Sequence, residues 1–343
     1  MFNILSNPKK YKEGVKIKKT LPLDTNPMIK TYPSVGNYLG ILNGCGYDTM
    51  GILFKHYLDY YYAKGFVTFL ELDYIRLKKF KRIPFTYSDD NFIQQVQKNL
   101  EDGRYLLLIL NEHFVEDSRI HTSVVHYHDW LIYGYDNEAN TFLLHGYYGS
   151  EKYPRIYGSI EVSCEDVKRG VFYALNERHM YKDKRINMDN HIFWPKENIE
   201  EKITKKAVRK SLKRYISKFA IIFYRYQFFV ITGENAMSQY RKYIHKIKEL
   251  FDNPNNKEID VRPFSFCLEH KKIIQRALKQ YSNNPEAAEN YGKQVVDHFD
   301  KILKLLTKFK VHQDVKIIGQ VVKHMDEAQE HEIKILSDFL MET

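Results

Sequence analysis

A histidine stands where a strand is predicted to begin. The segment HDWLIYGYD runs from His128 to Asp136 and places an apolar run between the histidine and a closing Gly-Tyr-Asp. Imidazole can accept and return a proton near neutral pH, so His128 is a candidate general base. The alternative is that the segment is only a buried strand running into a turn. A catalytic role requires a nucleophile elsewhere in the chain.

The chain has three cysteines, Cys45, Cys164 and Cys267, and a thiolate is the strongest nucleophile a side chain offers. Their wide spacing predicts neither a disulfide framework nor a metal site, and it is typical of a reducing cytoplasm. Cys45 lies between Gly44 and Gly46, just before a predicted helix whose dipole would favour the thiolate. The alternative is that Cys45 is a small, inert residue buried in a turn.

The elements that position these residues follow from apolar periodicity and from turn-forming residues. NYLGILN is predicted as a short buried helix, and a later strand leads into a helix capped by Ser163. The other predicted elements are a helix over 49–65, a helix over 89–103, a buried strand over 104–111, and a hairpin of strands 129–136 and 141–148 around an Asn- and Asp-containing turn.

Beyond Pro195 the strand patterns give way to long helical patterns. Segments 286–310 and 315–340 are predicted as an antiparallel helix pair. Segment 219–232 is apolar but contains Arg225 and is too short to span a bilayer, so a buried helix is expected. The fold class expected is α+β, with an N-terminal arm or edge strand at 1–24, a mixed domain at 25–195 and an all-helical domain at 196–343.

The chain is basic, with a formal net charge of +10, and 43% of its residues are hydrophobic, which excludes global disorder. Residues 202–218 contain eight Lys or Arg and no acidic residue. This basic stretch is interpreted as a solvated helix face, a surface for an acidic protein, or, less favoured, a nucleic-acid contact. The first residues lack a long apolar run, so no signal peptide is expected and the predicted location is cytoplasmic.

The segments RYLLLILNEHF and HDWLIYGYDNEANTFLLHGY resemble the papain-like cysteine peptidase fold in its compact peptidase C39-like form. More narrowly, residues 25–180 resemble relatives of the butirosin acyltransferase and the amide-forming enzymes of closthioamide-like antibiotic biosynthesis. The resemblance implies a papain-like catalytic domain whose general base is a histidine that begins a strand ending in Gly-Tyr-Asp. His128 matches that position.

The resemblance places the nucleophile at the start of the first core helix, in the stretch TYPSVGNYLGILNGCGYD. The family pattern aligns with Ser34, because Leu39 and Leu42 then fall on packing positions. The family has cysteine there, so either the hydroxyl acts, or the site is inactive, or this serine replaces a native cysteine. Backbone N–H groups near Gly36, helped by the side chain of Asn37, are expected to hold the oxyanion.

A third group is expected to orient the histidine. In many relatives an Asp follows the next strand, where this chain has Gly146. Asn111, at the end of the buried strand, is the possible substitute. Asp129 is expected to be a poor orienting group, because adjacent residues of a strand point to opposite faces. Cys45 stays the alternative nucleophile, and a chain with no nucleophile is the third possibility.

Metal binding is the alternative role for the clustered histidines. Four of them lie within residues 113–128, but His126 and His128, which share a face, have no clear Cys or carboxylate companion, so no metal site is expected. The histidines of the predicted C-terminal helices are expected on the surface. The histidines considered are His113, His121, His126 and His128 in the first group, and His312, His324 and His331 in the second.

The resemblance therefore implies an acyltransferase that takes an acyl group from a carrier-protein thioester and passes it to an amine. No cofactor is expected, because the phosphopantetheine arm belongs to the partner, an acidic acyl carrier protein. Two alternatives stay open: a binding or scaffold protein that keeps the fold without the chemistry, and a peptidase. No membrane or nucleic-acid partner is expected, and a homodimer is left open.

Overall fold

The structure is a computed structural model with two compact units. Unit 1 comprises residues 1–22 and 82–194, and unit 2 comprises residues 23–81 and 195–343. The chain therefore also divides near residue 195, but the segment 23–81 joins the C-terminal part rather than the mixed domain predicted at 25–195. The described residues are 18–58, 60–63, 66–69, 74–114, 127–148, 156–177, 190–197, 199–216, 221–223, 229–232, 261–312 and 314–342.

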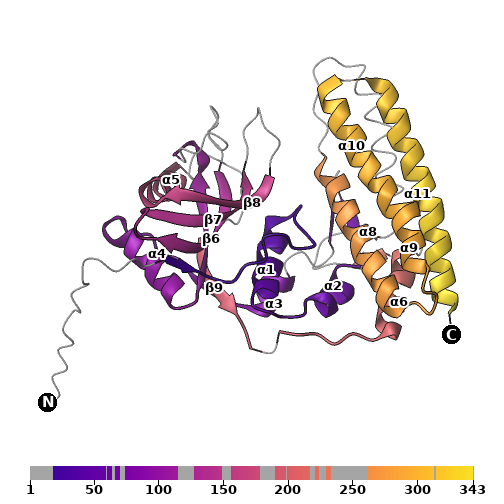
Figure 1. Ribbon diagram of the computed structural model, residues 1–343, viewed down its shortest axis with the longest axis horizontal. Coiled ribbons are helices and arrows are strands. Elements are labelled where there is room, and N and C mark those ends of the chain that lie inside the picture. The colour runs from indigo at the N-terminus through magenta and orange to yellow at the C-terminus, as the bar shows by residue number, and fades with distance from the viewer. Residues whose placement is uncertain are drawn as a thin grey trace. The chain divides into compact units, whose positions relative to one another are not determined.

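An antiparallel sheet forms the centre of unit 1 (Figure 1). Within the described residues it has seven strands, in the order β4-β9-β5-β6-β7-β8, and the remaining strand, β1, pairs with β6. The strands are β1 (Lys18–Thr20), β4 (Phe80–Pro84), β5 (Tyr105–Asn111), β6 (Tyr127–Asp136), β7 (Thr141–Tyr148), β8 (Ile156–Ser163) and β9 (His191–Pro195).

The predicted hairpin is confirmed by the pairing of β6 with β7. Its turn forms because Asp136 Oδ1 accepts hydrogen bonds from the N–H groups of Glu138 (2.9 Å) and Ala139 (3.1 Å). Asn140 then takes a φ of 51°, a left-handed conformation that Asn tolerates better than most residues. Of the arm predicted at 1–24, residues 1–17 lie outside the described part, and β1 is an added strand of the sheet.

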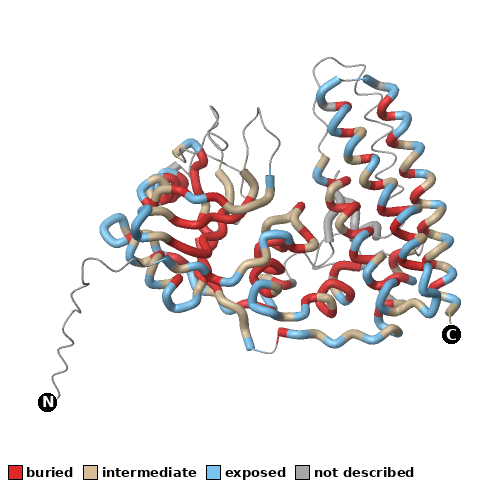
Figure 2. The backbone as a smooth tube through the Cα atoms, in the orientation of Figure 1, coloured by how far each residue is buried: buried red, intermediate tan, exposed pale blue. Residues whose placement is uncertain are grey.

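Two helices pack against β5 and against each other in unit 1, α4 (Phe92–Glu101) and α5 (Cys164–Glu177). A short 3-10 turn, η1 (Asp89–Asn91), precedes α4, and another, η2 (Glu112–Phe114), follows β5. The predicted cap of α5 is present, since the Asp166 N–H donates to Ser163 Oγ at 3.3 Å. Residues buried between these helices and the sheet form the core of the unit (Figure 2).

Helices dominate unit 2, and its C-terminal end includes the predicted helix pair. Segment 286–310 contains α9, a π-helical turn and most of α10, and α10 packs along α11 (Figure 1). The helical elements are α1 (Pro33–Gly44), α2 (Met50–His56), α3 (Tyr74–Lys79), α6 (Lys205–Ile216), α8 (Arg262–Tyr281), α9 (Ala287–Tyr291), the π-helical turn η3 (Gly292–Val296), α10 (Asp297–His312) and α11 (Val315–Met341).

Two predicted helices of unit 2 contain strands instead. The helix expected over 49–65 ends at His56 and is followed by β2 (Tyr60–Ala63), and the helix expected over 219–232 is replaced by β10 (Ile221–Phe223) and β11 (Phe229–Thr232). With β3 (Phe66–Phe69) they form an antiparallel sheet of four strands among the described residues, in the order β10-β11-β2-β3. Aromatic and β-branched residues dominate these segments and favour strands, so the C-terminal domain is not all-helical.

The segment 23–81 belongs to unit 2 because its helices pack on C-terminal helices. α2 contacts both α6 and α8. Gly51 of α2 lies so close to the chain at Glu201 that a Cβ built on it would stand 1.5 Å from the Glu201 carbonyl oxygen. Only glycine allows this approach. Among the described residues, no helix combines the length and the apolar character that crossing a membrane requires.

Candidate functional site

Ser34 is the second residue of α1. Tyr32 precedes the helix as N-cap, and Pro33 occupies the first helical position, where its fixed φ and missing N–H are tolerated. The positive end of the helix dipole therefore lies at Ser34, as expected for a nucleophile position. The predicted packing residues Leu39 and Leu42 are both buried.

The predicted oxyanion groups lie in the same first turns of α1. The N–H groups of Val35 and Gly36 both donate to the Tyr32 carbonyl at 2.8 Å. An oxyanion at Gly36 would therefore compete with an existing hydrogen bond. Asn37 is buried, with 1% of its surface exposed.

A half-buried glutamate on α8 holds the segment that leads into α1. Glu269 accepts hydrogen bonds from the backbone N–H groups of Lys30 (2.9 Å) and Thr31 (3.0 Å). Burial raises the pKa of Glu269 to about 7, although these two N–H donors and the Lys30 ammonium act in the opposite direction. The ring of Phe266, also on α8, lies edge-on to Tyr32 with centroids 5.7 Å apart. These contacts hold the segment that precedes α1 against α8.

We expect the stability of the protein to depend on pH through Glu269. Its folded-state pKa of about 7 lies above the ordinary 4.5, so the folded protein binds this proton more tightly than the unfolded chain does. The resulting stabilisation is full below pH 4.5 and is lost as the pH rises through 7, and it amounts to roughly 3 kcal/mol.

The measurement is urea denaturation of the wild type and Glu269→Gln at pH 4.5 and pH 8. The stability of the wild type relative to the variant should fall with rising pH. Glu330→Gln, which changes an exposed carboxyl on α11, is the control and should leave the pH dependence unchanged. A difference between wild type and Glu269→Gln that is the same at both pH values would contradict the expectation.

His128 lies at the start of β6, opposite Leu110 of β5. Its Nδ1 is 3.0 Å from the Asp129 carbonyl oxygen and 3.3 Å from Asp129 Oδ1. The carbonyl oxygen accepts the hydrogen bond, so the neutral ring carries its proton on Nδ1 and leaves Nε2 as the basic nitrogen. The side chain is 21% exposed, so solutes have access to it.

Asp129, predicted to be a poor orienting group, thus lies against the His128 ring. Strand alternation sends the Cα–Cβ bonds of His128 and Asp129 to opposite faces, but rotation about the side-chain bonds brings the carboxylate back to the ring. Asn111, the possible substitute as orienting group, is 1% exposed, and its Oδ1 accepts a hydrogen bond from the His113 N–H at 3.0 Å. That contact caps the turn η2.

An indole ring lies against Gly146, the position at which many relatives of the resembling family have an Asp. A Cβ built on Gly146 would lie 3.1 Å from Trp130 Cε3, so even alanine would crowd the ring. Trp130 is fully buried, and its Nε1 donates to Glu112 Oε1 at 3.2 Å. Glu112 is itself 3% exposed, and this buried carboxyl was not anticipated from the sequence.

Cys45 is not placed as expected. It is the C-cap of α1, its N–H donates to the Ile41 carbonyl at 2.9 Å, and α2 begins only at Met50. The negative end of a helix dipole lies at a C-terminus and does not stabilise a thiolate. Cys45 is exposed, not buried in a turn. Burial raises the pKa of both Cys164 and Cys267 to about 12, so these thiols are unreactive.

A serine–histidine pair inside unit 1 was missed in the sequence. His145 Nδ1 is 2.9 Å from Ser159 Oγ across the β7–β8 ladder. The His145 ring is fully buried and lies edge-on to Tyr157, with centroids 4.5 Å apart. The two residues meet only because the register of β7 and β8 places them opposite each other. No local sequence pattern predicts this pairing. Ser159 is half-buried, so its hydroxyl is a second candidate nucleophile beside Ser34.

The predicted site residues divide between the two units. Ser34, Gly36, Asn37 and Cys45 belong to unit 2, whereas Asn111 and His128 belong to unit 1. No family model and no curated protein matches this sequence. Of the four clustered histidines, His121 and His126 lie outside the described residues.

Proposed function

We propose that the protein is an acyltransferase that forms an amide from a carrier-protein thioester in specialised-metabolite biosynthesis. The observation that carries the proposal is the environment of His128. The Asp129 carbonyl oxygen accepts a hydrogen bond from Nδ1, the Asp129 carboxylate lies 3.3 Å from the same nitrogen, and the ring remains partly exposed with Nε2 as its basic nitrogen. Such an oriented imidazole can take a proton from a nucleophile and return it to a leaving group.

The nucleophile in the proposal is Ser34. Its hydroxyl oxygen attacks the thioester carbonyl, His128 takes the hydroxyl proton, and the carrier thiol leaves with that proton. An amine then attacks the serine ester, His128 accepts the amine proton and returns it to Ser34, and the amide is released. A papain-like fold is part of the proposal. A serine in place of cysteine makes the first step slower, because its hydroxyl is almost never ionised near neutrality.

The surface of α6 supports an acidic partner. Val208, Leu212 and Tyr215 are the buried residues of this helix. Exposed lysines follow one another at helical spacing on its other side, Lys206, Lys210 and Lys213. A row of solvated ammonium groups attracts an acidic acyl carrier protein and speeds its encounter. The three free cysteines fit the proposed cytoplasmic location.

A binding protein without catalytic activity is the second candidate. It is favoured by serine at position 34 and by Trp130, whose ring occupies the space that a side chain at Gly146 would need. In that case the protein would bind the carrier through α6 but form no covalent adduct. The two candidates therefore differ in one measurable property, the acylation of the chain.

The test is incubation with an acyl-loaded carrier protein followed by intact-mass measurement. The wild type should gain one acyl group, Ser34→Ala should gain none, and Ser34→Cys should be acylated faster because a thiol is the better nucleophile. Ser265→Ala, which changes a half-buried serine near the start of α8, is the matched control and should be acylated like the wild type. Carrier binding without an adduct in the wild type and in Ser34→Cys would support the binding protein and refute the transferase.

A further inference from the structure

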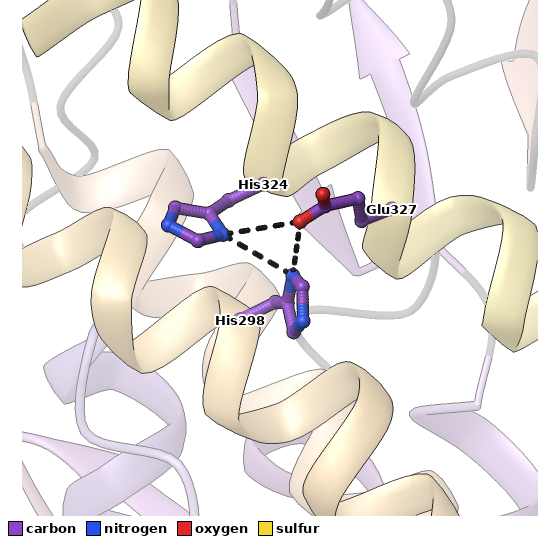
Figure 3. Close-up of side chains that lie close together, drawn as sticks. All are labelled: His298, His324 and Glu327. Atoms are coloured by element: carbon purple, nitrogen blue, oxygen red, sulfur yellow. Dashed lines mark hydrogen bonds and ion pairs between the residues drawn. The ribbon is translucent and has the colours of Figure 1, made fainter.

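Two histidines and a glutamate meet on the α10–α11 hairpin. His298 is the second residue of α10, and His324 and Glu327 lie three residues apart on α11, which puts them on one face. Figure 3 shows the two imidazole rings and the carboxylate pointing toward one another. The sequence predicts His324 on the surface, but its side chain is only 25% exposed.

The three facing atoms form a nearly regular triangle. His298 Nδ1 and His324 Nδ1 are 3.3 Å apart, and Glu327 Oε2 is 3.5 Å from each of them. A tetrahedral metal with bonds of about 2.1 Å to nitrogen and oxygen separates its ligand atoms by about 3.4 Å. Octahedral geometry with the same bond length would separate adjacent ligands by only about 3.0 Å. The triangle therefore has the dimensions of one face of a tetrahedral site.

Hydrogen bonding alone accounts for this triangle less well. One neutral imidazole can donate from Nδ1 to the other, but the carboxylate oxygen stands 3.5 Å from both rings. Good hydrogen bonds from nitrogen to oxygen span about 2.7–3.2 Å. Lys323 Nζ is 3.8 Å from Oε1, the other oxygen of Glu327, so that lysine does not occupy the side facing the histidines. One cation among the three atoms would satisfy all of them at once.

We propose that His298, His324 and Glu327 bind a divalent transition-metal ion of the zinc type. Two imidazole nitrogens and one carboxylate oxygen are ligands that Zn²⁺ accepts, and three protein ligands leave a fourth position for water. The ion joins the beginning of α10 to the middle of α11. Because α10 follows directly on the π-helical turn η3, bound metal fixes this junction as well.

The experiment is titration of chelator-treated full-length protein with Zn²⁺ in competition with a chromophoric chelator. The wild type should bind one ion at this site, and its Tm should rise on binding. His298→Ala, His324→Ala and Glu327→Gln should each weaken binding by at least about 10–100-fold, which is the loss typical for disturbing even an outer-shell partner. His312→Ala, which removes an exposed histidine at the end of the same helix α10, should bind like the wild type.

A second measurement separates a lost ligand from a lost fold. Each variant should keep the circular dichroism of the wild type without metal, and Co²⁺ in the wild type should give the intense visible absorption of a tetrahedral complex. The proposal is overturned if the His298→Ala/His324→Ala double variant binds Zn²⁺ as tightly as the wild type. A wild type that does not bind Zn²⁺, or a weak Co²⁺ spectrum typical of six oxygen or nitrogen ligands, overturns it too.

Discussion

Replacing His128 with glutamine is expected to slow the acylation of the protein by about 10²–10⁴-fold, the usual contribution of a positioned general base. Glutamine keeps a polar group of similar size but cannot take up the proton of the nucleophile. The measurement is the single-turnover rate with an acyl-loaded carrier protein. Asp129→Asn should slow the reaction less, because it removes the carboxylate beside Nδ1 while the backbone carbonyl of residue 129 still accepts from the ring.

His113→Gln is the matched control for this prediction. It changes an exposed histidine of unit 1 that lies in η2, and acylation should proceed at the wild-type rate. Equal rates for the wild type and His128→Gln would remove His128 from the mechanism. Equal losses in His113→Gln and His128→Gln would point to a general disturbance of unit 1 and would likewise contradict the assigned role.

The second large effect is expected in the core of unit 2, where a lysine and a glutamate are buried together. Lys271 Nζ lies 3.0 and 2.7 Å from the two carboxylate oxygens of Glu332, and the two side chains are 0% and 7% exposed. The hydroxyl groups of Tyr215 and Tyr291 donate to the same carboxylate. The pair therefore joins α8, α11, α6 and α9.

Glu332→Leu should destabilise the protein by about 3–5 kcal/mol, because it leaves the Lys271 ammonium buried without its counter-charge. The double variant Lys271→Met/Glu332→Leu should recover most of this loss, since both charges are then removed. Glu289→Ala is the control: it breaks an exposed pair with Lys293 and should change stability by less than about 1 kcal/mol.

The measurement is urea denaturation followed by circular dichroism. A single Glu332→Leu variant that is as stable as the wild type would show that the ion pair does not hold the helices together. A double variant that is no more stable than the single one would show that the loss comes from packing rather than from the unpaired charge.

The sequence was informative wherever local chemistry decides the structure. The β6–β7 turn forms through Asp136 and Asn140, and the α5 cap forms through Ser163, so both could be predicted. Segments 49–65 and 219–232 were mispredicted because short aromatic and aliphatic runs suit a buried helix as well as a strand. Only pairing with distant strands decides between the two, and that information is not local.

The candidate site shows the same division. The place of His128 at the start of a strand followed from the apolar pattern, and the place of Ser34 in the first turn of α1 followed from the family resemblance. The contact of Asp129 with the ring depends on side-chain rotation, and the filling of the space at Gly146 depends on Trp130. Such features arise from tertiary packing and could not be read from residue spacing.

The acylated residue itself gives the most direct test of the proposed mechanism. Trypsin cleaves after Lys30 and Lys55, and the peptide 31–55 between these sites contains both Ser34 and Cys45. The wild type is acylated, the carrier protein is removed, and this peptide is fragmented. The fragment masses then assign the acyl group to one residue. We predict an oxygen ester at Ser34. An adduct at Cys45, or an unmodified 31–55 peptide from a protein whose intact mass shows a bound acyl group, would contradict the account.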